Sequence, residues 1–186
     1  IEDWAFVDCD ALTRIVLPKT VNSIGSNAFS FCNSLASIYV EPENSKYLSR
    51  NGTLYERYTS EINGNFRSCL RILQYAVART DDEIQLVSPD SNFLLLEISD
   101  YAFQDCISVK SIVFGPDIQT IGNNAFNGCI NLSKVSLTTS LQSIGNYAFF
   151  NCPLFTSVTI PRNVMSIGSA AFGYVDFSTK IDEFAI

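Results

Sequence analysis

The chain has 186 residues, of which 47% are hydrophobic and 17% are charged, so it is long enough to bury a sizeable core. Its net charge of −7 and isoelectric point near 4.5 argue against a nucleic-acid-binding surface and against binding to anionic membranes. The sequence contains no apolar run of about 18 residues, so it predicts no membrane-spanning segment.

One sequence unit recurs along the chain. Its copies start at Ile1, Ile24, Ile98, Ile121, Ile144 and Ile167. Four of the five intervals are 23 residues long and the other is 74, so one interval is stretched by 51 residues. Counted from the isoleucine, every copy has Ala at position 5 and Phe at position 6. Position 9 is Cys9, Cys32, Cys106, Cys129 and Cys152 in five copies and Val175 in the last.

The first part of each unit predicts a short helical turn. Position 3 is always Asp, Asn or Ser, whose side-chain oxygen can cap the N-terminus of a helix. Ala, Phe and Cys at positions 5, 6 and 9 then fall on one helical face. Position 2 is Gly25, Gly122, Gly145 or Gly168 in four copies, which indicates a positive φ or a close backbone approach. Glu2 and Ser99 depart from this rule.

The second part of each unit predicts a β-strand. The pattern L-x-x-I-x-L, seen at Leu12-Ile15-Leu17, ends in apolar residues that alternate with polar ones, as in a half-buried strand. Pro18 and Pro161 end the strand in two copies. We therefore expect an α/β solenoid with one parallel strand and one short helical turn per 23-residue repeat, stacked around a continuous core.

The stretched interval, residues 41–97, predicts a β-hairpin-like insertion. Gly52-Leu54-Tyr55 and Leu70-Ile72-Leu73-Tyr75 could pair with each other, and Ile84-Leu86 could rejoin the main sheet. No Gly/Ser-rich or Pro-rich linker separates this stretch from the flanking repeats. We expect residues 1–186 to form a single domain that is a fragment of a longer chain, because the sequence begins and ends inside a repeat.

The repeat "IGxxAFxxCxxLxxIxLPxxVxx" resembles the BspA-type leucine-rich repeat, also called the Treponema pallidum type. The resemblance is close over residues 1–40 and 98–175. Residues 41–97 resemble the longer, degenerate repeats of that family through Asn44, Tyr47, Gly52, Leu54 and Tyr55. Ala76 replaces the family's proline. The resemblance implies a surface or secreted protein of the kind implicated in adhesion to host matrix proteins and in co-aggregation.

The repeated cysteines predict buried free thiols. A spacing of 23 residues is no metal-binding signature, and the chain has no histidine to complete a zinc site. Cysteines in register on stacked coils would keep their Cβ atoms about 5 Å apart, which is beyond disulfide reach. We therefore expect no metal, no cofactor and no disulfide in this ladder.

Catalytic signatures are missing from the sequence. The absence of histidine excludes the usual Ser or Cys triads, and no phosphate-binding loop is present, so we expect no enzyme. Asp81, Asp82 and Glu83 are adjacent acids, for which solvation is favoured over calcium binding. Asn51 and Asn131 lie in glycosylation sequons, which matter only in a glycosylating secretory pathway.

The outward face of the strands is the predicted ligand-facing surface. Its residues are Arg14, Val16, Ser37, Tyr39, Ser111, Val113, Lys134, Ser136, Ser157 and Thr159. Arg14 and Tyr39 are the preferred contacts, because binding hot spots favour Tyr and Arg. A competing surface is a patch in the insertion formed by Tyr47, Tyr55, Tyr58 and Tyr75.

Three functions remain open from the sequence. The first is a non-enzymatic protein-binding module of a cell-surface adhesin or surface antigen, whose partner is a host matrix protein or a protein of a partner cell. The second is a structural stalk that holds another domain away from the cell surface. The third is an intracellular scaffold, which free thiols favour. The cell-surface or secreted location follows from the family resemblance alone.

Overall fold

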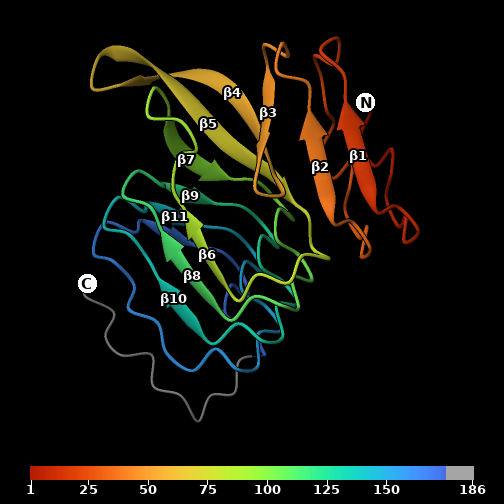
Figure 1. Cartoon of the computed structure of the whole chain (residues 1–186). Coiled ribbons are helices and arrows are strands. Elements are labelled where there is room, and N and C mark those ends of the chain that lie inside the picture. The colour runs from red at the N-terminus through yellow and green to blue at the C-terminus, as the bar shows by residue number, and fades with distance from the viewer. Residues whose placement is uncertain (175–186) are drawn as a thin grey trace.

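The computed structural model describes residues 1–174, which form a β-solenoid of about seven turns with repeats of about 23 residues. We call each turn a coil and name it by its first residue. Figure 1 shows the stacked coils and a long hairpin, β4–β5, that extends over the later coils, so that its tip and coil residues such as Gln119 and Met165 line one hollow. The described residues contain no helix, and so none that is long and apolar enough to cross a membrane.

Two rows of parallel strands run along the solenoid. The first row contains β1 (Arg14–Leu17), β2 (Ser37–Val40), β6 (Glu83–Leu86), β8 (Ser111–Phe114) and β10 (Lys134–Ser136). The second row contains β7 (Leu94–Ile98), β9 (Thr120–Ile121), β11 (Ser143–Ile144) and β12 (Ser166–Ile167). The predicted repeat strand is confirmed by the first row. The expectation of one strand per repeat missed the second row, because two-residue strands show no alternation in the sequence.

The first-row strands pair with residues one repeat away. Arg14 pairs with Ser37 and Ile15 with Ile38, both in parallel register and both 23 residues apart. Exposed and buried side chains alternate along β1 and β2, so the isoleucines point inward and the polar residues point outward. The alternation of apolar and polar residues along each strand therefore determines which face is buried and which register the strands adopt.

The predicted helical turn, and with it the α part of the α/β class, is wrong for residues 1–174. Positions 4 and 8 of the coils have positive φ, for example 53° at Asn124 and 77° at Gly128, which a right-handed helix excludes. In coil Ile121, the N–H groups of Asn124, Phe126 and Gly128 donate to carbonyls of the next coil, at 2.9, 2.8 and 3.0 Å. Stacking thus uses the N–H groups that a helix would bond internally.

The side chains at position 3 cap the neighbouring coil instead of a helix. Asn123 Oδ1 accepts a hydrogen bond from the backbone N–H of Asn146 at 2.8 Å, and Asn146 Oδ1 accepts one from Ser169 N–H at 2.7 Å. Asp3 and Asp100 accept equivalent bonds, each at 2.7 Å. The predicted helix cap is wrong, because residues 1–174 contain no helix; in four coils the side-chain oxygen accepts from a backbone N–H of the next coil instead.

The repeated glycines allow neighbouring backbones to approach closely. None of the four glycines at position 2 has a φ in the left-handed region. A Cβ atom on Gly145 would lie 2.6 Å from the backbone N of Asn123, and the other three glycines meet the preceding coil as closely. At Ser99 the preceding element is β5 and not a regular coil, and Ser99 N–H donates to Ile72 O there.

The stretched interval forms the predicted hairpin. It contains β3 (Tyr47–Arg50), β4 (Thr53–Ile62) and β5 (Asn65–Tyr75), and β4 pairs antiparallel with both β3 and β5. On its other side β5 pairs in parallel with β7, and β6 pairs with β8, so the chain returns to the solenoid as predicted. Figure 1 shows β1–β3 on one side of the hairpin base and the later coils on the other.

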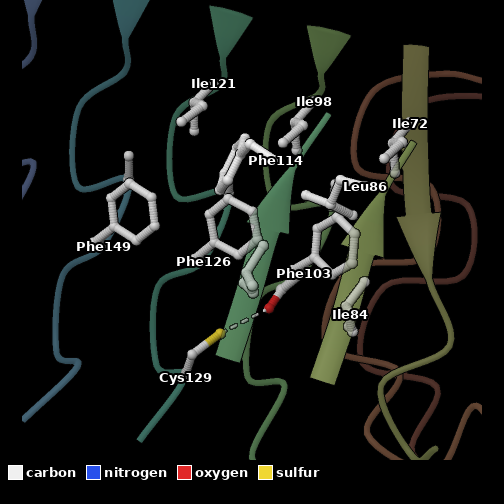
Figure 2. Close-up of a cluster of buried hydrophobic side chains, with 14 of the residues drawn as sticks. Ile72, Ile84, Leu86, Ile98, Phe103, Phe114, Ile121, Phe126, Cys129 and Phe149 are labelled. Atoms are coloured by element: carbon white, nitrogen blue, oxygen red, sulfur yellow. Dashed lines mark hydrogen bonds between the residues drawn. The ribbon is translucent and has the colours of Figure 1, made fainter. Parts of the chain in front are cut away.

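The core contains a column of stacked aromatic rings. Successive ring centroids of Phe103, Phe126, Phe149 and Phe172 are 5.0, 5.0 and 5.3 Å apart. In Figure 2, Phe103, Phe126 and Phe149 of this column lie below a parallel row formed by Ile72 of β5, Ile98 of β7 and Ile121 of β9. Tyr75 extends the column by stacking on Phe103 at 5.1 Å. Phenylalanines from different coils therefore share one interior, as the repeat predicted.

The core is divided at the hairpin, so the expectation of one continuous core is wrong. One buried cluster contains the first two coils together with Tyr47, Leu54 and Ala76. The other contains the later coils together with Tyr55 and Leu70. Adjacent hairpin residues face opposite clusters because side chains alternate along a strand. That residues 1–186 form a single domain remains a prediction.

The repeated cysteines are free, and four of the five in the ladder are buried. Burial raises the pKa of Cys129 well above its usual value. The Cys129 thiol donates to the carbonyl of Phe103 in the preceding coil at 3.2 Å (Figure 2), and Cys32 and Cys152 make the same contact. The ladder thus has a structural role. Val175 lies outside the described residues.

Candidate interaction surfaces

The first part of the predicted ligand-facing surface lies on β1 and β2. Arg14 is in register with Ser37, and Val16 with Tyr39. All four side chains are exposed, and Val16 and Tyr39 retain 49% and 44% of their accessible surface. Two exposed apolar side chains side by side, with a guanidinium beside them, form a compact patch. We call Arg14, Val16, Ser37 and Tyr39 the β1–β2 patch.

The second part lies on a separate sheet formed by β6, β8 and β10. Here Ser111 is in register with Lys134, and Val113 with Ser136. Ser157 and Thr159 are exposed and alternate with buried Val158 and Ile160. The strand residues of the two groups therefore lie on different sheets, which the hairpin separates along the chain, whereas Ser157 and Thr159 lie outside any strand.

Glu83 and Gln85 of β6 complete the second face, where the sequence pattern did not place them. They are in register with Ser111 and Val113. Glu83 accepts a hydrogen bond from the Ser111 hydroxyl at 3.0 Å. The alternation of Glu83 and Gln85 with Ile84 and Leu86 was a usable signal, but the adjacent acids suggested a solvated loop.

The acidic stretch divides among separate partners. Asp81 pairs with Arg79 at 2.7 Å and accepts a hydrogen bond from the Tyr75 hydroxyl, and both contacts lower the pKa of Asp81. Asp82 pairs with Lys110 at 3.0 Å. Among residues 1–174 no group of three His, Cys, Asp or Glu side chains could hold a metal ion. These acids serve local contacts.

The proposed tyrosine patch does not form a common exposed surface. Tyr47, Tyr55 and Tyr75 are 1%, 7% and 1% exposed. Each is buried because the hairpin base lies between the two core clusters, and Tyr75 takes the place of the repeat phenylalanine. Tyr58 alone is partly accessible. The tyrosine patch is therefore corrected to three core residues and one surface residue.

Tyr58 belongs to a charged network on the outer face of the second strand row. The Arg71 guanidinium lies 4.6 Å from the Tyr58 ring centroid, and the Tyr58 hydroxyl donates to Glu97 at 2.7 Å. Burial and the Glu97 carboxylate raise the pKa of Tyr58. Arg71 also lies 3.6 Å from Glu56 and 3.4 Å from Glu97. Sequence reasoning could not place these residues together, because their pairing depends on the register of the hairpin.

The two sequon asparagines are both exposed. Asn51 has a φ of 48° and lies in the turn between β3 and β4. The side-chain amide of Asn131 donates to the carbonyl of Ile107 in the preceding coil at 2.7 Å. Asn51 is thus free to carry a glycan without losing a side-chain bond within residues 1–174, whereas Asn131 already has a structural contact. Glycosylation of either remains a prediction.

The comparison with protein families gave one match. The pattern of the BspA type leucine-rich repeat region matches residues 1–93 and 96–184 in six copies. No curated protein sequence matched at a significant level.

Solved structures share the fold. A leucine-rich cell surface protein from Faecalibacterium prausnitzii is 27% identical with a TM-score of 0.75, over 90% of this chain and 40% of that one. The pneumococcal vaccine antigen PcpA is 26% identical with a TM-score of 0.71, over 84% of this chain and 35% of that one. A leucine-rich repeat protein from Bacteroides capillosus has a TM-score of 0.61 at 19% identity, over 75% of this chain and 96% of that one. This chain spans less than half the length of the first two proteins.

Proposed function

Because the chain belongs to the BspA-type leucine-rich repeat family, we propose that it is a non-catalytic protein-binding module of a bacterial cell-surface protein. Leucine-rich repeats are typically binding modules without catalysis. The similar proteins support the location, since one is a cell surface protein and another a vaccine antigen. The proposed partner is a protein of the host matrix or of a neighbouring cell.

The β1–β2 patch is the observation that carries this proposal. Its Tyr39 and Arg14 are of the residue types that dominate protein-binding energies. They stand on paired strands whose inward side chains, Ile15 and Ile38, are buried, so the patch is held rigidly. Rigid presentation reduces the entropy lost when a partner binds.

A solid-phase binding assay against a panel of purified matrix proteins tests the proposal. The wild-type chain should bind at least one of them, and the pair Arg14→Ala and Tyr39→Ala should weaken binding roughly 30-fold, as expected for hot-spot residues. The matched control is Lys134→Ala with Ser136→Ala, an exposed pair on the other sheet. Equal affinities of the wild type and the β1–β2 variant would count against the patch.

Two alternatives predict different outcomes. A structural stalk would bind no protein on the panel and would tolerate deletion of coil Ile121, because each coil contacts only its neighbours. An intracellular scaffold would resist protease added to intact cells, whereas a surface protein would be cleaved. Protease treatment of cells that express the full-length protein therefore decides the location.

A further inference from the structure

A cleft lies where the hairpin interrupts the ladder of the solenoid. It has a volume of about 330 Å³, within the range of small-ligand sites. One wall is the start of coil Ile24, including Asn27, and the other is the start of coil Ile98, including Asp100. Leu73 and Gln74 of β5 lie between the two walls. The cleft is therefore lined from both sides of the divided core.

In the regular part of the solenoid, the first residues of the preceding coil occupy the position that corresponds to this cleft. Between coils Ile121 and Ile144, Gly145 N–H donates to Ile121 O and Asn124 N–H donates to Asn146 O, at 2.8 and 2.9 Å. In addition, Asn146 N–H donates to the side-chain oxygen of Asn123 at 2.8 Å. Positions 1 to 4 of one coil thus satisfy the backbone of the next.

In the hairpin, the part of β5 that corresponds to positions 1 to 6 of a regular coil is two residues shorter. Ser99 N–H donates to Ile72 O at 2.9 Å and Tyr75 N–H donates to Ala102 O at 2.8 Å, so Ile72 and Tyr75 take positions 1 and 6. Four residues separate these positions in a regular coil, whereas only Leu73 and Gln74 separate Ile72 from Tyr75. The residues that would present positions 3 and 4 to coil Ile98 are missing.

Both walls consequently expose backbone groups that are paired elsewhere in the solenoid. Within residues 1–174, neither the N–H nor the C=O of Asp100 makes a hydrogen bond, and the N–H of Asn27 makes none. The buried side-chain oxygen of Asn27 also has no partner in this part of the chain. Asp100 is exposed, so water can pair with its backbone groups in the free chain. An occupant that displaces this water must offer an oxygen acceptor beside Asp100 N–H, a donor beside Asp100 O, and a carbonyl beside Asn27 N–H.

The charges of the cleft select among possible occupants. Its lining contains three carboxylates, Glu56, Glu97 and Asp100, and one guanidinium, Arg71. Arg71 already lies between Glu56 and Glu97. A further carboxylate would meet net negative charge, whereas a neutral side-chain amide supplies the same oxygen without repulsion.

We propose that this cleft binds an asparagine-containing turn of a partner protein, with the bound segment replacing the two missing residues. The asparagine side-chain oxygen would accept from Asp100 N–H, as Asn123 accepts from Asn146 in the regular stack. The residue after it would donate its N–H to Asp100 O. This site is separate from the β1–β2 patch, and the proposal goes beyond the one made for that surface.

The chain contains a reporter for this site. Trp4 is its only tryptophan, and its ring lies edge-on to Tyr101, with centroids 6.2 Å apart. Tyr101 follows Asp100 directly, so binding beside Asp100 should change the fluorescence of Trp4. Amide chemical shifts of Asn27 and Asp100 provide an independent measurement.

The test titrates the chain with the blocked peptide acetyl-Gly-Asn-Gly-amide, and with the same peptide carrying Asp or Leu in place of Asn. The Asn peptide should shift the Asn27 and Asp100 amides and bind at least tenfold more tightly than the other two. No shift at these amides at millimolar peptide, or equal binding of the Leu peptide, would overturn the proposal.

Matched variants locate the binding. Ser26 is exposed and lines the cleft, whereas Ser169 holds the same position 3 in coil Ile167, away from it. Ser26→Tyr should reduce peptide binding at least tenfold, and Ser169→Tyr should leave it unchanged. Equal effects would overturn the proposed location. Inserting Asn-Gly between Leu73 and Gln74 places the asparagine at position 3, so it should also abolish binding by restoring the missing segment.

The proposed function can fail separately from this site. Arg14→Ala with Tyr39→Ala should leave peptide binding unchanged, because neither residue lines the cleft. Loss of peptide binding in that variant would contradict the separation of the two sites. Peptide binding that persists in a chain that binds no matrix protein would support the cleft alone.

Discussion

The coils from Ile98 onward and the two coils before the hairpin use the same repeat but differ in how completely it is satisfied. Phe126 has a ring neighbour on both sides, each at 5.0 Å, and is fully buried. Phe6 has one stacked neighbour, Phe29 at 5.4 Å, and remains 38% exposed. Phe29, which lies between coil Ile1 and the hairpin, is 2% exposed. Phe6 is therefore exposed because coil Ile1 has a neighbouring coil on only one side among residues 1–174.

This difference shows that the core of the solenoid belongs to the junctions between coils. Phe126, with a stacked ring from the coil on either side, is fully buried. Where the hairpin interrupts the junctions, the core divides and a cleft opens. The comparison predicts that equivalent substitutions will have unequal effects in the two regions.

The largest difference is expected for the ring column. Phe126→Ala removes a buried ring with two stacked neighbours and should lower the free energy of unfolding by about 3–5 kcal/mol. Phe6→Ala removes a ring that is already partly exposed and should cost about 1 kcal/mol. Urea unfolding followed by circular dichroism measures both values. Equal losses would show that burial between coils does not set the contribution of each ring.

The second-largest difference is expected in the alkylation rates of the cysteine thiols. Cys9 is half-buried, whereas Cys129 is fully buried and its pKa is raised well above the usual value by burial. Because the thiolate is the reactive form, alkylation of the native protein by iodoacetamide should be roughly 100-fold faster at Cys9. Mass spectrometry of peptides after timed labelling gives the two rates. Similar rates would mean that the later coils open as readily as the first.

The sequence predicted those features that recur in every coil. The period, the buried phenylalanines and thiols, and the inward isoleucines of β1 and β2 all follow from residue spacing. The helical turn was mispredicted, because the spacing of Ala, Phe and Cys cannot reveal that the intervening N–H groups bond to the next coil. The buried state of Tyr75 and the contact of Arg71 with Glu97 depend on the hairpin register, for which the chain offers one copy and no repetition.

A smaller contrast is expected at position 2. Gly145→Ala would place a Cβ atom about 2.6 Å from the backbone of the preceding coil and should destabilise the protein by about 1–3 kcal/mol. Ser99→Ala changes a position that already carries a side chain and should have an effect of about 0.5 kcal/mol or less. Thermal and urea unfolding of both variants tests this. A neutral Gly145→Ala would refute the close approach as the reason for the glycine.

The smallest effect is expected at position 8, where Asp105 and Asp8 share a left-handed backbone, with φ of 56° each. Asp105 is half-buried and its carboxylate accepts no hydrogen bond within residues 1–174, so burial raises its pKa. Asn151 occupies the same position in a later coil with a φ of 54°. Asp105→Asn should therefore stabilise the protein at pH 7 by a few tenths to about 1 kcal/mol.

The pH dependence of that gain identifies its cause. A carboxyl group whose pKa is raised in the folded state destabilises the fold above that pKa and has no effect below the unfolded value of about 3.9, where both states are protonated. The advantage of Asp105→Asn should thus be present at neutral pH and vanish as the pH falls below about 4. Asp8→Asn is the matched control, because Asp8 is exposed and its substitution should change stability little at either pH. A gain at Asp105 that persists at pH 3 would indicate a backbone preference for asparagine instead of the relief of a buried charge.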